Sequence, residues 1–190
     1  MRQSTIFILF LIGTLSGAKE SIAQEKNDEP YDNLATKEAL PIPKEKGQLF
    51  YLQRDPNANT VIYTLNLEDG EIDEDKPVSA HWIRYAENGE RSDLSFIQRK
   101  MAYGVHHKKV NEDEFDIRIQ AYKSLPIKLK FNKQKDRYQA FTRIENKEVV
   151  LEKIFVRIDG GSVFSPNVKY IEITGHDPVS QSKICHRFLP

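Results

Sequence analysis

The sequence predicts a mainly β protein, an antiparallel barrel-like or two-layer sheet of about eight or nine strands with one α-helix after the third strand. Two observations carry this prediction. From position 47 onward, short runs alternate apolar and polar residues, which is the period of strands that bury one face. One stretch, at about residues 93–103, departs from the alternation and repeats its apolar residues at helical spacing. Short turns between successive strands favour a sheet that closes or folds over on itself.

The alternating runs give nine predicted strands: 48–54, 59–67, 78–85, 115–121, 125–131, 137–144, 148–158, 168–174 and 183–189. Turn signals such as Asn88-Gly89 separate them. Between Leu151 and Ile154 the apolar residues change parity. One extra residue near Glu152-Lys153 would reconcile the two halves, so we expect a β-bulge there.

The helix is expected to follow the third strand. Ser92 or Asp93 can cap its amino end, and Gly104 is a plausible stop. Its predicted buried stripe consists of Leu94, Ile97, Met101 and Val105. We therefore expect this face of the helix to pack on the sheet.

The first residues have the features of a secretory signal peptide. Arg2 precedes an apolar run at 6–12, and small residues follow as far as Ala23. Cleavage is expected after Ser21-Ile22-Ala23, with Ser16-Gly17-Ala18 as the second choice and an uncleaved anchor as the alternative. The run is too short for a membrane-spanning helix, which needs about 20 apolar residues. We expect a periplasmic or secreted protein with no membrane span after cleavage.

These features divide the chain into a signal peptide (1–23), a flexible charged leader (24–46) and a single β-rich domain (47–190). The leader is charged and proline-punctuated, so it buries too little apolar surface to offset its ordering entropy. Its end, with Leu40, Pro41, Ile42 and Pro43, could dock locally as an extended segment.

Charge and cysteine content narrow the function classes. The chain has 28 basic and 28 acidic residues, and cleavage would leave 26 and 27, so no electrostatic case for nucleic acid exists. Cys185 is the single cysteine, so no internal disulfide is possible. We interpret it as a small, half-buried residue on the last strand; an intermolecular disulfide or a reactive thiol is the alternative.

The sequence lacks the common signatures of catalysis and cofactor binding. It contains no CxxC, HExxH, GxSxG, phosphate-binding glycine loop or EF-hand. We therefore predict no cofactor. A metal site that joins His106-His107 with His176 and Asp177 is conceivable, but nothing in the spacing requires it.

Three groups of side chains are candidates for binding. The first joins Arg54 and Asn57 at the end of the first strand, where turn chemistry explains the asparagine. In the third strand Trp82 and Arg84 share a face. Arg84 is therefore part of a structural ion pair with Glu87, Asp55 or Glu152, stacked on an aromatic ring, or an anion-binding group. The helix adds further donors. The predicted binding site is Arg54, Asn57, Trp82, Arg84, Gln98, Arg99 and Tyr103.

Two functional hypotheses follow. The first is a non-enzymatic module of the cell envelope that binds a small anionic ligand or an envelope protein. The second is a small exported hydrolase-like enzyme that uses Asp55, His81, His176 and Asp177 as acid–base groups. No catalytic residue is predicted by a motif.

Three segments carry a family resemblance: LFYLQRDPNANTVIYTLNL (49–67), HWIRYAENGE (81–90) and LSFIQRKMAYGV (94–105). With them the chain resembles a family of exported bacterial domains catalogued as a domain of unknown function. Position 81 is His where a second aromatic residue is expected, which weakens a catalytic role for His81. The resemblance implies an exported location and a domain that covers most of the mature chain, and it implies no activity, cofactor or partner.

Overall fold

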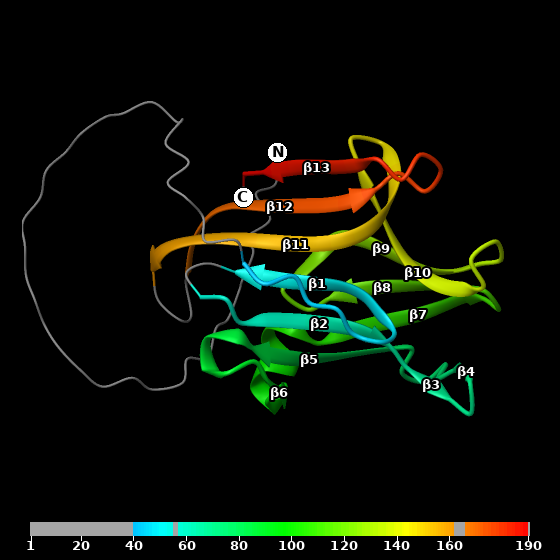
Figure 1. Cartoon of the computed structure of the whole chain (residues 1–190), viewed down its shortest axis with the longest axis horizontal. Helices are drawn as coiled ribbons and strands as arrows, with labels where there is room; N and C mark the ends of the chain where they lie inside the picture. The colour runs from blue at the N-terminus through cyan, green and yellow to red at the C-terminus, as the bar shows by residue number, and fades with distance from the viewer. Residues whose placement is uncertain (1–39, 55–56, 162–165, 190) are drawn as a thin grey trace, which may run out of the picture.

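A computed structural model describes residues 40–54, 57–161 and 166–189 (Figure 1). The predicted class is confirmed: the protein is mainly β, with 64% of the described residues in strands. The strands are β1 (Gln48–Arg54), β2 (Thr60–Leu65), β3 (Leu67–Glu68), β4 (Glu71–Ile72), β5 (Val78–Arg84), β6 (Glu90–Asp93), β7 (Val105–Asn111), β8 (Glu114–Ile119), β9 (Tyr122–Asn132), β10 (Arg137–Ile144), β11 (Lys147–Gly161), β12 (Pro166–His176) and β13 (Lys183–Phe188). The predicted signal peptide and most of the leader lie outside the described residues.

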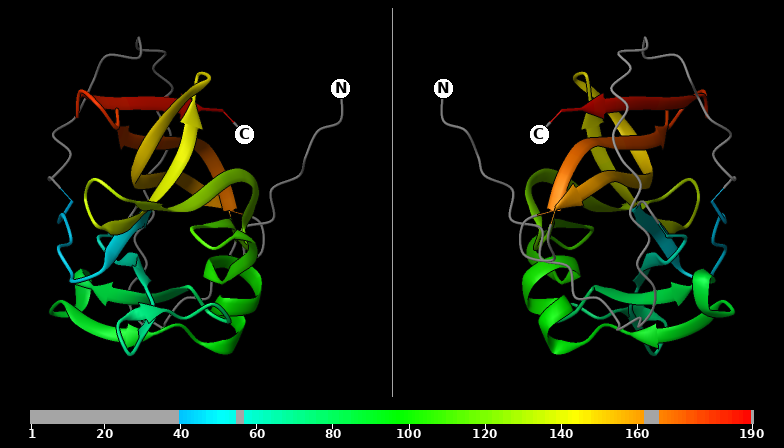
Figure 2. Two further views of the ribbon diagram at one scale, coloured as in Figure 1. Left: turned by 90° about the vertical axis from the view of Figure 1, so that its right-hand side faces the viewer. Right: turned by 90° about the vertical axis from the view of Figure 1, so that its left-hand side faces the viewer.

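Most strands belong to one curled sheet that forms a half-barrel. Its order is β6-β5-β2-β1-β11-β10-β9-β8-β7, and β12 and β13 extend it from the other edge of β11. Figure 2 shows the strands curling around a common interior, with β12 and β13 (orange and red) opposite β5 and β6 (green). All the pairings are antiparallel except that of β1 with β11, so the sheet is mixed.

The long strand β11 is the branch point of the sheet. Lys147–Val150 pairs with β10, and Lys153–Val156 pairs with β1 along the same edge. Opposite β12 the register shifts between Leu151 and Lys153, which confirms the predicted β-bulge. A bulge bends a strand and increases its twist. β10 and β1 therefore follow the two halves of one bent strand.

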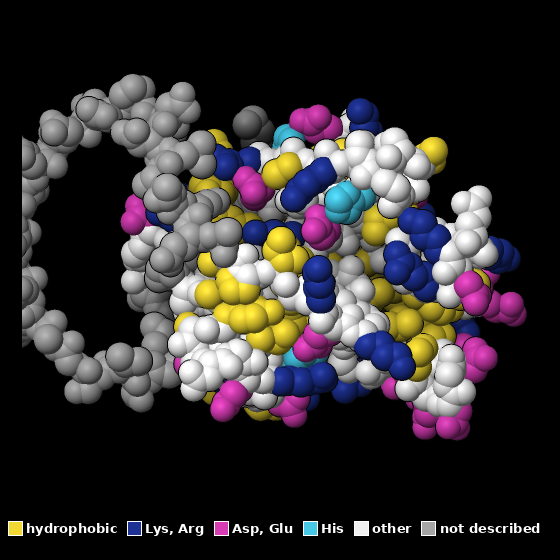
Figure 3. All heavy atoms as spheres, viewed as in Figure 1, with side chains coloured by type: hydrophobic (Ala, Val, Ile, Leu, Met, Phe, Trp, Pro, Cys, Tyr) yellow, Lys and Arg dark blue, Asp and Glu magenta, His cyan; other side chains and the backbone are white. Residues whose placement is uncertain are grey.

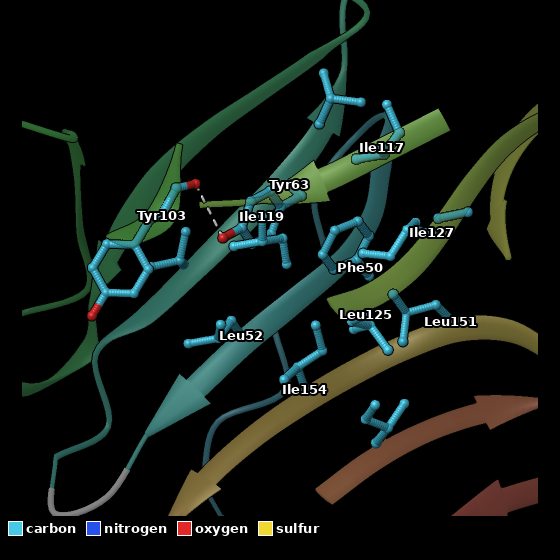
Figure 4. Close-up of a cluster of buried hydrophobic side chains, with 14 of the residues drawn as sticks. Phe50, Leu52, Tyr63, Tyr103, Ile117, Ile119, Leu125, Ile127, Leu151 and Ile154 are labelled. Atoms are coloured by element: carbon cyan, nitrogen blue, oxygen red, sulfur yellow. Dashed lines mark hydrogen bonds between the residues drawn. The ribbon is translucent and has the colours of Figure 1, made fainter. Parts of the chain in front are cut away.

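The inner face of the sheet carries the main core (Figure 4). Phe50 and Tyr63 stack in it with ring centroids 4.5 Å apart, and both are almost fully buried. The hydroxyl of Tyr63 donates to the carbonyl oxygen of Tyr103 at 3.2 Å, drawn as a dashed line in Figure 4. Because a buried hydroxyl needs a partner, this bond ties the helical segment to the centre of the sheet.

Residues 40–46, which we call the strap, cross the outer face of β1, β2 and β5. Pro43 is buried, and the side-chain amide of Gln53 donates to the carbonyl oxygen of Pro41 at 2.6 Å. Beneath it Tyr51, Ile62 and Ile83 form a second apolar cluster. The strap explains why β2 is buried on both faces.

The helical segment differs from the expected helix. It begins with one α-turn, α1 (Phe96–Gln98), and continues as a π-turn, η2 (Arg99–Tyr103); a separate 3₁₀ turn, η1 (Tyr85–Glu87), follows β5. Ser95 caps α1 in a capping box with Gln98, so the prediction of Ser92 or Asp93 as the cap was wrong. The cause is β6, which draws residues 90–93 into the sheet.

The predicted buried stripe of the helix was wrong as well. Leu94 is buried, but Ile97 and Met101 are 44% and 40% exposed. The π-turn adds a residue to the turn, and it points Ala102 and Tyr103 into the core instead. Within the described ranges, no helix has both the length and the hydrophobicity that crossing a bilayer requires.

Two further expectations need correction. β7 was not predicted, because its residues after Val105 are exposed on both faces and carry no alternation. Cys185 is exposed on β13, where half-burial was expected, and the hydroxyl of Thr174 lies 3.7 Å from its sulfur.

Candidate functional site

Four of the seven predicted site residues lie together where β1, β5 and the helical segment meet. The indole N–H of Trp82 donates to Oε1 of Gln98 at 3.3 Å. The ring of Tyr103 meets the Trp82 ring edge-on at 5.0 Å between centroids, and the guanidinium of Arg54 lies 5.8 Å from the Trp82 ring centroid. We call these residues the indole cluster. Its geometry combines an aromatic pair with a cation–π contact.

Burial shifts the pKa values of two side chains in the indole cluster. Desolvation lowers the pKa of Arg54 from its ordinary value, and the charge of Tyr103 opposes that effect. Desolvation also raises the pKa of the Tyr103 phenol well above its ordinary value. Both side chains have further interaction partners in the folded chain. A partly dehydrated guanidinium interacts more strongly with an anion than an exposed one does.

Arg84 does not join the indole cluster. Its Nε donates to the hydroxyl of Ser92 at 2.9 Å, and one terminal nitrogen contacts both carboxylate oxygens of Glu87 at 3.1 and 3.2 Å. The side-chain amide of Asn59 donates to the same carboxylate at 3.4 Å. Of the roles left open for Arg84, the structure therefore shows the ion pair, with Glu87 as the partner.

Asn57 and Arg99 are also held by local contacts. The side-chain oxygen of Asn57 accepts from the backbone N–H of Asn59 at 3.0 Å, which is turn chemistry. Arg99 donates to the carbonyl oxygen of Leu94 at 2.7 Å and so braces the start of the helical segment. The three arginines singled out in the sequence do not converge on one point.

A separate groove lies where the half-barrel stays open, between β5 and β7. β6 pairs with β5 over His81–Arg84 only, and β7 pairs with β8 alone among the described strands. The facing edges leave a groove of about 690 Å³, with Phe96, Arg99 and Lys100 of the helical segment on its wall. We call it the seam groove. Its volume is in the range of ligand-binding sites.

More cationic than acidic residues line the seam groove, although the whole chain has no net charge. Two acidic residues, Asp75 and Asp93, line it with five cationic ones: Lys76, Arg91, Arg99, Lys100 and Lys123. His81, His106 and His107 line it too. Except for Arg99, the sequence interpretation missed the cationic residues, because they come from separate segments that only the tertiary fold brings together.

One comparison with known proteins identifies a family. The family model described as Domain of unknown function (DUF4833) matches residues 50–187. The chain belongs to the DUF4833 family. The match confirms the suspected family resemblance, and it spans the sheet from β1 to β13. No curated protein and no solved structure matches this DUF4833 chain significantly.

The acid–base residues of the hydrolase hypothesis are spread over the DUF4833 fold. Nε2 of His81 on β5 lies 2.7 Å from Glu45, and Nε2 of His176 on β12 lies 3.0 Å from Glu152. The strands β2, β1 and β11 separate β5 from β12 in the sheet. Asp55 lies outside the described residues. The two histidines therefore lie on different strands and contact different carboxylates.

Asp177 has a local role in the loop after β12. Its side chain accepts from the backbone N–H groups of Val179 and Ser180 at 2.9 and 2.8 Å. These bonds hold the pKa of the Asp177 carboxyl below its ordinary value. His106 contacts Gln120 instead of a metal partner. In the part of the chain that the structure describes, no three His, Cys, Asp or Glu residues form a group that could hold a metal ion.

The pair of His81 and Glu45 fixes the strap of this DUF4833 domain to the sheet. The His81 side chain is 2% exposed, and its buried Nδ1 has no hydrogen-bond partner among the described residues. The Nε2–H group therefore donates a hydrogen bond to the carboxylate of Glu45. Arg91 lies 3.9 Å from the same carboxylate.

Replacing Glu45 by glutamine should lower the free energy of unfolding by about 1–2 kcal/mol, because it removes a charge-assisted bond to a buried ring. Urea unfolding measures the loss. Glu90→Gln, at an exposed position of β6, is the matched control and should change stability by less than about 0.5 kcal/mol. Equal stability of the two variants would show that the pair does not hold the strap.

Proposed function

We propose that the protein is an exported, non-enzymatic binding module of the cell envelope that holds a small anionic ligand in the seam groove. One observation carries the choice of ligand: five cationic and two acidic side chains line a groove of about 690 Å³. Such a concentration of one sign in a concave site attracts ligands of the opposite charge.

The walls of the seam groove support this function further. Lys100 lies 5.7 Å from the ring centroid of Phe96, so an ammonium group and an aromatic surface stand side by side. Val78 and Val105 add apolar surface between the strand edges. Ligand sites typically combine such apolar walls with a few polar groups that fix orientation.

The proposed location depends on the first 23 residues. A positive start at Arg2, the apolar run at 6–12 and the small residues around Ala23 are the three parts of a signal peptide. Envelope fractionation of cells that express the chain tests the location. Amino-terminal sequencing of the exported protein should begin at Gln24.

Binding is tested by thermal unfolding with phosphate, citrate and a sulfated disaccharide. A probe at 100 times its Kd should stabilise the protein by about 2.7 kcal/mol. The double variant Lys100→Gln/Lys123→Gln should weaken the affinity about tenfold, since each lost charge contributes up to about 1 kcal/mol. Lys133→Gln/Lys169→Gln, with both side chains exposed away from the groove, is the control. Equal affinity of the two double variants would exclude the seam groove.

The indole cluster is a second candidate for the anion. It is favoured by the partly dehydrated guanidinium of Arg54 on the Trp82 ring. Arg54→Met keeps the length of the side chain and removes its charge. If the indole cluster holds the ligand, this variant should lose affinity about tenfold or more, because charge-assisted bonds contribute about 1.5–3 kcal/mol. If the seam groove holds it, the affinity of Arg54→Met should stay within about twofold of the native value, which is about 0.4 kcal/mol.

A further inference from the structure

A second groove lies between β1 and β10, the two strands that pair with the same edge of β11. β11 pairs with β10 over Phe141–Ile144 and with β1 over Tyr51–Arg54, and the two partners diverge beyond these pairs. The space between the start of β1 and the start of β10 is a groove of about 740 Å³. We call it the fork groove. Among the described residues, Arg91 alone lines both this groove and the seam groove.

One wall of the fork groove is an unpaired strand edge, exposed at Arg137 and buried at Gln139 and Ala140. Residues 137–140 of β10 pair with β9 on one side, and no described strand pairs with them on the other. Four residues of extended chain span about 13 Å, enough for a short strand to add. The opposite wall cannot pair as regularly, because the register of β1 shifts between Gln48 and Phe50.

The lining of the fork groove favours an acidic occupant. Among the described residues that line it, Glu45 is the only acidic one, and it already contacts His81 and Arg91. The cationic lining residues are Lys46, Arg91 and Arg137, and the apolar ones are Leu49, Leu65, Leu67, Ala140 and Val150. At the end of the molecule where β3, β4 and β10 lie, Figure 3 shows apolar side chains with both basic and acidic side chains around them.

We propose that the fork groove binds an extended acidic peptide segment of another protein, which adds as a strand to β10. Backbone hydrogen bonds to residues 137–140 would supply affinity, and the cationic rim would select acidic side chains at the ends of the segment. This site is independent of the anionic ligand proposed for the seam groove.

Fluorescence anisotropy on the full chain tests this with three labelled peptides. The acidic probe is acetyl-Glu-Val-Thr-Val-Glu-amide; the second has lysine in place of glutamate; the third is the acidic peptide with N-methylated backbone amides. Because N-methylation removes the donors that strand addition needs, both altered peptides should bind at least about tenfold more weakly. Hydrogen exchange should slow at residues 137–140 when the acidic probe is bound.

A pair of variants locates the site. Arg137→Glu should weaken the acidic peptide about fivefold, since an exposed charge contributes up to about 1 kcal/mol. Lys133→Glu, an 80% exposed position in the turn before β10, should change its affinity less than twofold, about 0.4 kcal/mol. Equal binding of the N-methylated peptide, equal effects of the two variants, or no binding at millimolar peptide would overturn the proposal. Binding that appears only after deletion of residues 24–39 would assign the groove to the chain's own leader instead.

Discussion

Replacing Gly104 by alanine should destabilise the protein by about 3–4 kcal/mol, the largest effect we expect from one added methyl group. A Cβ at this position would lie 2.0 Å from the carbonyl oxygen of Arg99. That oxygen accepts the Gly104 N–H at 3.0 Å and closes the π-turn. The backbone φ of −61° is ordinary, so the cost is steric: the turn must open, and the buried Tyr103 must move.

The control for this variant is Gly89→Ala. Gly89 has a φ of +73° and open space around its Cβ position, so alanine there should cost about 1 kcal/mol from backbone strain alone. Both free energies come from urea unfolding monitored by far-ultraviolet circular dichroism. A Gly104 variant no less stable than the Gly89 variant would contradict the π-turn.

Truncating Trp82 to alanine should cost about 4 kcal/mol, as expected for a large buried aromatic side chain. The indole is 4% exposed and contacts Tyr103, Gln98 and Arg54 at once. Its loss leaves a cavity under the helical segment and removes the ring below a partly buried guanidinium. Urea unfolding gives the change in the free energy of unfolding.

Trp82→Phe separates the ring from the indole N–H. It keeps an aromatic face for Arg54 and Tyr103, so its cost should be about 1–2 kcal/mol, well below that of alanine. A Trp82→Ala variant within about 1 kcal/mol of the native protein would mean that the indole cluster is not part of the core.

The sheet could be predicted from the sequence because the alternation of apolar and polar residues is visible within each strand. β8 buries every second residue, and β1 and β10 have the predicted bounds. The bulge at Glu152 was predicted for the same reason, because one inserted residue changes the parity of the apolar residues on either side of it. In contrast, the exposed edge strand β7 has no buried face and so leaves no pattern.

The parallel pairing of β1 with β11 could not be predicted, because it joins segments about a hundred residues apart. The π-turn was missed for another reason. The spacing of Leu94, Ile97 and Met101 fits an α-helix. In the structure the chain instead forms a wider π-turn, and the carbonyl oxygen of Tyr103 in this turn accepts a hydrogen bond from the Tyr63 hydroxyl. This contact between distant residues leaves no signal in the local spacing of apolar residues.

The candidate sites also contain some residues that the sequence indicated and others that only the fold brings together. Trp82 and Tyr103 were identified individually as unusual, and the fold brings them together. An ion pair of Arg84 was one of the roles considered, with Glu87, Asp55 or Glu152 as the partner, and the structure pairs it with Glu87. The cationic residues of the seam groove, such as Lys76 and Lys123, gave no signal, because nothing near them in the sequence marks them.

The most direct test of the seam groove as an anion site is a titration of the isotope-labelled protein with citrate, followed by backbone amide chemical shifts. If citrate binds in the seam groove, saturable shifts should cluster at Lys100, at Val105–His107 and at Lys123, while the amides around Arg54 stay in place. Shifts that cluster at Arg54 and Trp82, or the absence of saturable shifts at the groove, would contradict it.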